Sequence, residues 1–450
     1  MTSKSSHQVS KYITVNGIHK LNPAWQGDAN NHTLQPFQNR HTALAVVSYP
    51  SQQNIFAPED EEIVVAPSYQ HAAEEYQNMI SDEAEMKLDE GNHHHGLGPL
   101  SSLLAKYEVP AGMLSKLLGI RNFSVAEMIV DDSSSMNAAT DATGLQGKRM
   151  TRWHEAKWRI LQMMELLAYI SKAPRVYVRF LNRGTFLVLE RAPDESPQVF
   201  FQRVASLVEQ EFAIRASGST PALERIRESL TRYPTSQPTL RYFLGDGVPN
   251  GAAYASKQIA QLLVQRAEPE KNPFTFMSCT NQDSATEWMK ECEEIAPYCS
   301  EFDDYMDESR EILKDQGKAF PYSYGLHLVA QIVAAFNPHD LDAMDESVPF
   351  TKPTLQDILG YQLSDPEYKY YFDSFLEAQH KKLNLSPIQR SFVLKLPELF
   401  LSFSNTPRAT AIPAVTEYKQ RMKTAAVHQN QAKTAAYPPS GQQAECCTIL

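Results

Sequence analysis

The sequence predicts an α/β fold for its central part: a doubly wound, mostly parallel sheet flanked by helices. Apolar runs of strand length alternate with stretches of helical periodicity over residues 99–345. Two of these runs end at oxygen-bearing side chains, as strands that border a ligand crevice do. The composition, with 42% hydrophobic and 21% charged residues, is that of a globular protein.

The first expected elements are two short amphipathic helices on either side of Pro110, because proline interrupts a helix. The run FSVAEMIV then has the length of a strand, and a helix is expected over 152–170. RVYVRFLN and TFLVLE predict two strands joined by a short turn, the second at an edge of the sheet.

Helices and strands then alternate. Strands are expected at TLRYFLG and FTFMSCT, and helices over residues 195–213, 221–233, 254–266, 285–295 and 324–336. The acidic stretch between Pro297 and Pro321 has no clear strand pattern, so the position of the last strand stays open.

The flanking regions differ from this pattern. Residues 1–98 are polar, with short strand-like pieces and no sustained period, and predict a less ordered region of unknown function. Residues 346–425 predict a helical extension packed on or beside the main domain, with two helices separated near Asp365 and Pro366. Residues 426–450 have the composition of a flexible tail.

Composition also excludes several functions. The formal net charge is −11 and no long basic block is present, which argues against nucleic acid as a partner. The sequence contains neither a run of about 20 apolar residues nor a glycine-rich phosphate loop. The five cysteines match neither a zinc site nor a disulfide framework, so a reducing cytosol is expected.

Hydroxyl and carboxyl side chains gather at three predicted strand exits or helix starts. Asp131, Ser133 and Ser135 follow FSVAEMIV, Thr220 precedes a helix, and Asp246 follows RYFLG. Because parallel strands end at the same edge of a sheet, we expect these oxygens to meet there. Oxygen ligands suit a hard divalent cation such as Mg²⁺. In the alternative interpretation the serines cap a turn in a metal-free domain.

The patterns D-x-S-x-S at Asp131, G-x-T ending at Thr220 and D-G at Asp246 resemble the metal-ion-dependent adhesion site of von Willebrand factor A domains. Met136 and Pro221 match that family as well. The resemblance covers about half of the chain and implies a Rossmann-like, doubly wound sheet.

The resemblance also implies roles for these residues. Ser133, Ser135 and Thr220 would contact Mg²⁺ or Mn²⁺ directly, and the two aspartates of the set would act mostly through bound water. One coordination position would be left for a carboxylate of a protein partner. Asp132 stands at the variable position of the pattern, where the family often has an uncharged residue. It is expected to be solvated, and the alternative is that it adds a negative field to the site.

The last four residues, Cys447 to Leu450, fit the C-a-a-X pattern for prenylation, and the final leucine favours geranylgeranyl. Cys446 could carry a palmitoyl chain, and two lipids anchor a protein more stably than one. The pattern predicts a peripheral, lipid-anchored protein on the cytoplasmic face of a membrane in eukaryotic cytosol, and otherwise a cytoplasmic protein. The alternative is a chance cysteine near the end of the chain.

These observations predict a metal-dependent protein-binding scaffold rather than an enzyme. A metal-dependent hydrolase or transferase acting on a phosphate or acyl group is the first alternative. The second is an effector protein of an intracellular microbe that uses host prenylation. A ubiquitin-ligase scaffold is disfavoured, because too few cysteine and histidine clusters are present for a RING.

Overall fold

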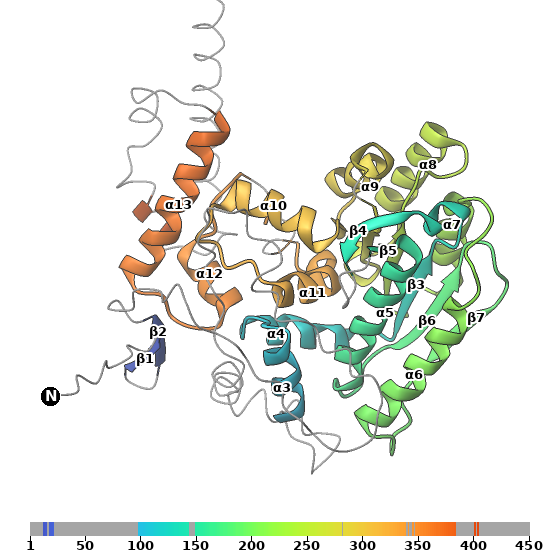
Figure 1. The fold of residues 1–450 in the computed structure, drawn as a ribbon, viewed down its shortest axis with the longest axis horizontal. Coiled ribbons are helices and arrows are strands. Elements are labelled where there is room, and N and C mark those ends of the chain that lie inside the picture. The colour runs from blue at the N-terminus through green and yellow to red at the C-terminus, as the bar shows by residue number, and fades with distance from the viewer. Residues whose placement is uncertain are drawn as a thin grey trace, which may run out of the picture.

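The computed structural model (Figure 1) describes residues 98–143, 149–280, 282–338 and 347–383, with short pieces at 12–15, 18–21, 341, 344–345, 400–401 and 403–404. The predictions made for Cys446, Cys447 and the tail over 426–450 lie outside these residues, as do most of those for 1–98. Within the described residues, no helix is long and apolar enough to cross a membrane.

A six-stranded sheet forms the centre of the described part, in the order β10-β9-β8-β3-β6-β7. The pairs along the sheet are parallel except β6 with β7, which lies antiparallel at the edge as predicted. The mostly parallel α/β class is therefore confirmed. The strands are β3 (Val125–Val130), β6 (Arg175–Phe180), β7 (Phe186–Leu189), β8 (Thr239–Gly245), β9 (Phe274–Ser278) and β10 (Cys299–Phe302).

Strand β3 lies inside the sheet, where all six of its residues are buried. It pairs in parallel with β6 on one side and with β8 on the other, so that Val130 lies level with Phe180 and Leu244. The residues that follow β3 and β8 therefore leave the same edge of the sheet side by side.

Two helical layers cover the two faces of the sheet (Figure 1). Alternate residues of β3 enter different cores: Met128 and Val130 join one hydrophobic cluster, and Ile129 joins the other. This alternation follows from the two-residue period of a strand. The first cluster includes α5 (Arg152–Ala168), α6 (Pro197–Phe212) and α11 (Tyr324–Val333); the second includes α7 (Ala222–Arg232), α8 (Ala252–Gln265) and α9 (Asp283–Ile295).

Oxygen-bearing side chains fix the starts of several helices by accepting a backbone N–H of the first turn. In α6, for example, Ser196 accepts from Val199 N and Pro197 takes the first helical position. Thr151, Asp304, Ser323 and Thr351 are further caps of this kind.

Further helices pack around the sheet domain. The predicted pair beside Pro110 is present as α3 (Gly98–Lys106) and α4 (Met113–Leu118). Beyond the sheet lie α12 (Lys352–Leu359) and α13 (Asp365–Leu383). Helix α13 packs on α10 (Tyr305–Gln316), where the Tyr371 hydroxyl donates to Gln316 Oε1 at 2.7 Å. Leu355, Phe372 and Phe375 belong to the same hydrophobic cluster as α11.

Some elements were not assigned from the sequence pattern. The last strand, β10, lies at the start of the acidic stretch, with Glu301 inside it, and α10 follows. The polar hairpin of β4 (Ala139–Thr143) and β5 (Arg149–Thr151) was not expected either. The remaining elements are the hairpin of β1 (Tyr12–Val15) and β2 (Ile18–Leu21) and the short 3-10 helices η2 (Gly119–Asn122), η3 (Ser134–Asn137), η4 (Pro269–Lys271) and η5 (Ala334–Phe336).

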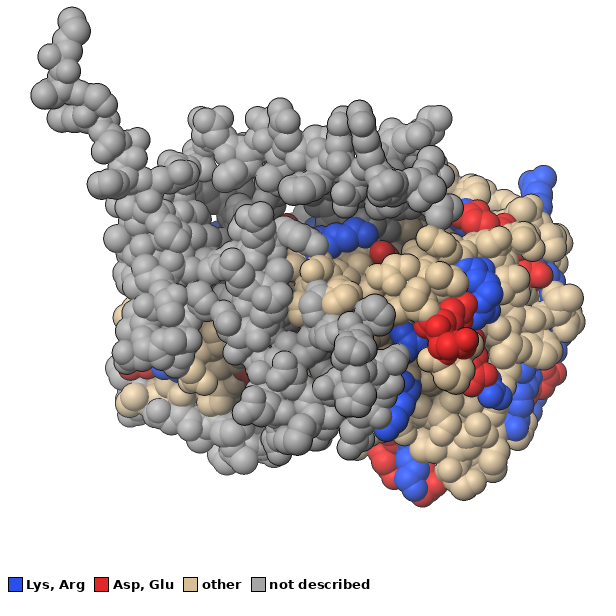
Figure 2. All heavy atoms as spheres, turned by 90° about the horizontal axis from the view of Figure 1, so that it is seen from below, with Lys and Arg blue, Asp and Glu red and all other residues tan. Residues whose placement is uncertain are grey.

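Charged side chains of both signs lie interspersed on the face shown in Figure 2. Several charged side chains of the described residues form exposed ion pairs, such as that of Arg175 with Glu190 at 2.7 Å. The described part of this face therefore presents no broad field of one sign that would steer a charged partner.

Candidate metal centre

Three loops meet at the carboxyl edge of the sheet. The turn after β3 contacts the loop before α7, because Ser134 N donates to Gly218 O at 3.1 Å. It also contacts the residue after β8, because the Ser135 hydroxyl donates to Asp246 Oδ1 at 2.9 Å. Asn250 N donates to Thr220 O at 2.8 Å and joins the last two loops. The segments that carry the predicted site residues are thus neighbours.

Asp131 lies at the centre of this arrangement and is fully buried. Its Oδ1 accepts the backbone N–H of Ser133 at 2.8 Å, whereas its Oδ2 has no hydrogen-bond partner in the described structure. Burial raises the pKa of this carboxyl group to about 7, and the negative charges of Asp246 and Asp132 add to the rise. An orphaned, buried carboxylate oxygen is costly unless a cation or a proton satisfies it.

The two serines link this aspartate to the neighbouring strand. Ser133 Oγ lies 2.9 Å from Ser135 Oγ, which in turn donates to Asp246. Ser133 is buried and Ser135 is exposed, so the chain of hydroxyl groups runs from the interior toward the surface. The short serine side chains allow these oxygen atoms to approach one another closely.

Asp246 is held on both carboxylate oxygens. Its Oδ1 accepts from Ser135, and its Oδ2 lies 2.6 Å from Arg152 Nη1 in a buried ion pair. Arg152 is the first residue of α5 and lies 94 positions away in the sequence. The sequence interpretation missed this arginine, and no local pattern could have revealed it.

Thr220 is buried, and Asn250 of the loop after β8 holds its backbone on both sides. Thr220 N donates to Asn250 Oδ1 at 3.1 Å, and Thr220 O accepts from Asn250 N at 2.8 Å. Gly218 allows the loop to reach this place: its φ is +115°, and a Cβ there would lie 2.6 Å from Asn182 Cγ.

The prediction that Asp132 is solvated was wrong. Asp132 is only 1% exposed, because its carboxylate serves as an anchor for the loop after β6. Its Oδ1 accepts from the backbone N and side-chain Nδ2 of Asn182, at 2.8 and 3.0 Å, and Arg183 Nε lies 3.1 Å from its Oδ2. A carboxylate can be buried at this turn because these partners satisfy its hydrogen-bonding capacity.

The donor set fits a hard cation by its chemistry. All the predicted ligands offer oxygen, and one buried carboxylate oxygen is free. Within the described residues, no group of three or more histidines, cysteines, aspartates or glutamates could hold a metal ion. A cation at this edge would therefore depend on the hydroxyl groups and on water, which Mg²⁺ retains readily.

A scan against models of known protein families and a search of curated proteins both found no match for this chain. The function of the site is therefore inferred from its residues alone.

Proposed function

We propose that this chain carries a von Willebrand factor A-type domain that binds a protein partner through a divalent cation. In this proposal Ser133, Ser135 and Thr220 hold Mg²⁺ or Mn²⁺ by their hydroxyl groups, and Asp131 and Asp246 act mostly through water. A carboxylate of the partner completes the coordination. The orphaned Oδ2 of buried Asp131 is the observation that carries the proposal.

The sheet topology supports the family assignment. Numbered along the chain, the six strands run 6-5-4-1-2-3 across the sheet, with the third antiparallel. In doubly wound folds of this order, ligands bind beyond the carboxyl ends of the strands, where the strand order reverses. That position lies between β3 and β8, which carry Asp131 and Asp246 at their exits.

The charges around the site support an anionic partner. Arg183 pairs with Asp132 and Arg152 pairs with Asp246, so that of these three aspartates only Asp131 has no cationic partner among the described residues. A divalent ion in this shell keeps excess positive charge, because the remaining ligands are neutral hydroxyl groups and water. Such an ion attracts a carboxylate and contributes both affinity and orientation.

Calorimetric titration of the metal-stripped chain with Mg²⁺ tests the metal. We expect binding by the native chain and none by Asp131→Ala. A panel of peptides that contain either glutamate or glutamine then tests the partner: glutamate peptides should bind only with Mg²⁺ present, and EDTA should release them. Glutamate binding that persists in EDTA would contradict the proposal.

The hydrolase alternative has its own outcome. Turnover of a phosphoester by the purified chain, lost in Ser133→Ala, would favour catalysis over simple binding. Attachment to a membrane through Cys447 remains a prediction from the sequence pattern alone.

A further inference from the structure

Arg152 places a positive charge inside the candidate metal centre. Its Nη1 lies 2.6 Å from Asp246 Oδ2, with 9% of the Arg152 side chain and none of the Asp246 side chain exposed. The other Asp246 oxygen, Oδ1, is engaged by the Ser135 hydroxyl. The carboxylate that the proposed function assigns to the metal shell is therefore already paired with a cation of the protein.

The arginine is fixed in this position by its backbone. Arg152 N donates to Ala138 O at 3.0 Å, and the preceding Thr151 caps α5 by accepting from His154 N. The start of the helix is thus tied to the residue that follows the serine turn. The backbone of Arg152 and the serine turn therefore belong to one hydrogen-bonded unit, and the guanidinium reaches Asp246 from this fixed position.

A guanidinium and a divalent cation at one carboxylate repel each other, and burial weakens the screening of that repulsion. The single negative charge of Asp246 can neutralise the charge of the guanidinium or contribute to binding the divalent ion, but it cannot do both fully. Burial of the pair means that solvent does not compensate the carboxylate when the arginine leaves.

We propose that Arg152 is an internal competitor for the metal, which holds Asp246 when no ion is bound and lowers the intrinsic metal affinity of the site. This inference rests on the proposed function, because it concerns the same metal. Arg152 acts through Asp246 and is a positioning residue rather than a ligand. Metal binding then replaces or weakens the pair between Arg152 and Asp246.

Magnesium titration of the full chain and three variants tests the inference. Arg152→Gln removes the competing charge and should bind Mg²⁺ at least about tenfold more tightly than the native chain. Arg152→Lys keeps the charge and should remain close to the native affinity. Arg203→Gln, at an exposed arginine of α6 that pairs with Glu195, is the matched control and should leave the affinity unchanged.

Thermal melting with and without Mg²⁺ provides a second readout that does not depend on the titration. Arg152→Gln leaves buried Asp246 without its cation, so its melting temperature should be lower in EDTA and should rise more on adding Mg²⁺ than that of the native chain. Equal or weaker Mg²⁺ affinity in Arg152→Gln would overturn the inference and leave the proposed function in place. Absence of Mg²⁺ binding in all four proteins would overturn the proposed function itself.

Discussion

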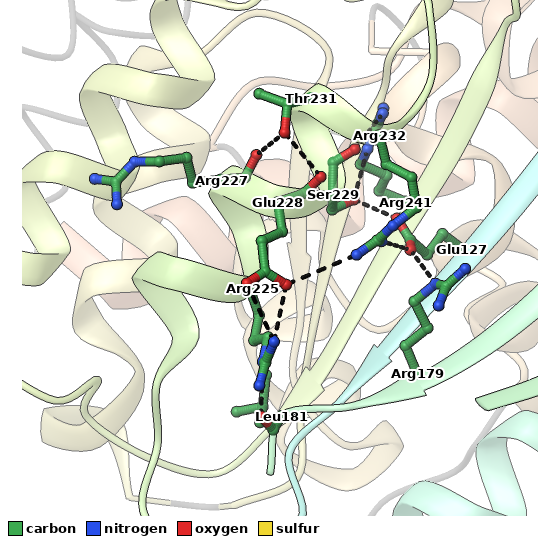
Figure 3. Close-up of polar contacts among 10 residues, drawn as sticks. All are labelled: Glu127, Arg179, Leu181, Arg225, Arg227, Glu228, Ser229, Thr231, Arg232 and Arg241. Carbon is green, nitrogen blue, oxygen red and sulfur yellow. Dashed lines mark hydrogen bonds and ion pairs between the residues drawn. The ribbon is translucent and has the colours of Figure 1, made fainter. Parts of the chain in front are cut away.

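Glu127 and Asp131 are both fully buried and only four positions apart, yet their surroundings differ. Glu127 lies within β3, where Arg179 Nε contacts its carboxylate at 2.8 Å and Arg232 and Ser229 also bind it (Figure 3). Asp131 lies just beyond the strand and has one unpartnered oxygen. A buried carboxylate that the protein itself compensates serves the fold, whereas one left partly unsatisfied is suited to an external ligand.

The elements around each acid explain the difference. Glu127 shares its face of the sheet with Arg179 of β6 and with α7, which brings Arg232 and Ser229 (Figure 3). Arg241 of β8 binds the Ser229 hydroxyl at 2.9 Å and extends the network. Asp131 lies past the last sheet pair and meets small hydroxyl side chains instead of arginines.

The largest expected effect comes from Glu127→Ala. Removing the carboxylate leaves Arg179 and Arg232 without their shared partner beside a buried strand, which should destabilise the fold by about 3 kcal/mol. Urea unfolding measures the loss, and Mg²⁺ should not restore it. A change below about 1 kcal/mol would show that solvent compensates these arginines and would remove the contrast with Asp131.

Asp131→Asn should stabilise the fold in metal-free buffer, whereas Glu127→Ala should destabilise it. The folded-state pKa near 7 lies above the ordinary value of 3.8, so the folded chain binds more protons than the unfolded chain between these values. The contribution of Asp131 to stability therefore falls as pH rises through that window, and above it the charged group destabilises the fold. Near pH 8, Asp131→Asn should gain on the order of 2 kcal/mol in EDTA and lose the stabilisation by Mg²⁺.

Asp132→Asn is the control for that experiment, because Asp132 is paired with Arg183 and Asn182. It should destabilise the chain with or without Mg²⁺. Equal responses of the two variants to pH and Mg²⁺ would show that Asp131 is not special among the buried aspartates.

Ser135→Ala should lower the affinity for Mg²⁺ more than it lowers the stability of the fold. It removes a proposed ligand and the bond to Asp246 Oδ1, so Mg²⁺ affinity should fall by about tenfold or more. Ser134→Ala is the matched control, because the Ser134 hydroxyl accepts from Gly218 N at the same turn. It should lower the stability by about 1 kcal/mol and leave the affinity for Mg²⁺ unchanged.

The smallest effect is expected for Glu228→Gln, which lies in the same view as Glu127 (Figure 3). Glu228 pairs with Arg225 at 2.9 Å on the surface of α7, and both side chains are well exposed. Its replacement should change stability by less than about 0.5 kcal/mol in urea unfolding. A larger loss would show that the exposed pair supports the buried network.

Periodicity alone predicted the part of the fold that positions the site. The apolar run Val125–Val130 and the run ending at Gly245 form buried, adjacent strands, because such runs belong inside a parallel sheet. Their exits were visible in the sequence as sudden changes from apolar to oxygen-bearing residues.

Pairings between distant residues were not predictable in this way. Arg152 and Asp246 are 94 positions apart, and Glu127 and Arg232 are 105 apart, so no local spacing connects them. Strand β10 was obscured by Glu301, a buried acidic residue in a strand of only four residues. Tertiary packing, not local pattern, determines these features.

Anomalous diffraction from crystals of the full chain grown with Mn²⁺ tests the central claim most directly. The account predicts one anomalous peak in contact with the hydroxyl groups of Ser133 and Ser135, with Asp131 Oδ2 turned toward the ion or its bound water. No peak at this edge of the sheet, with Asp131 Oδ2 bonded only to protein groups or left alone, would contradict it.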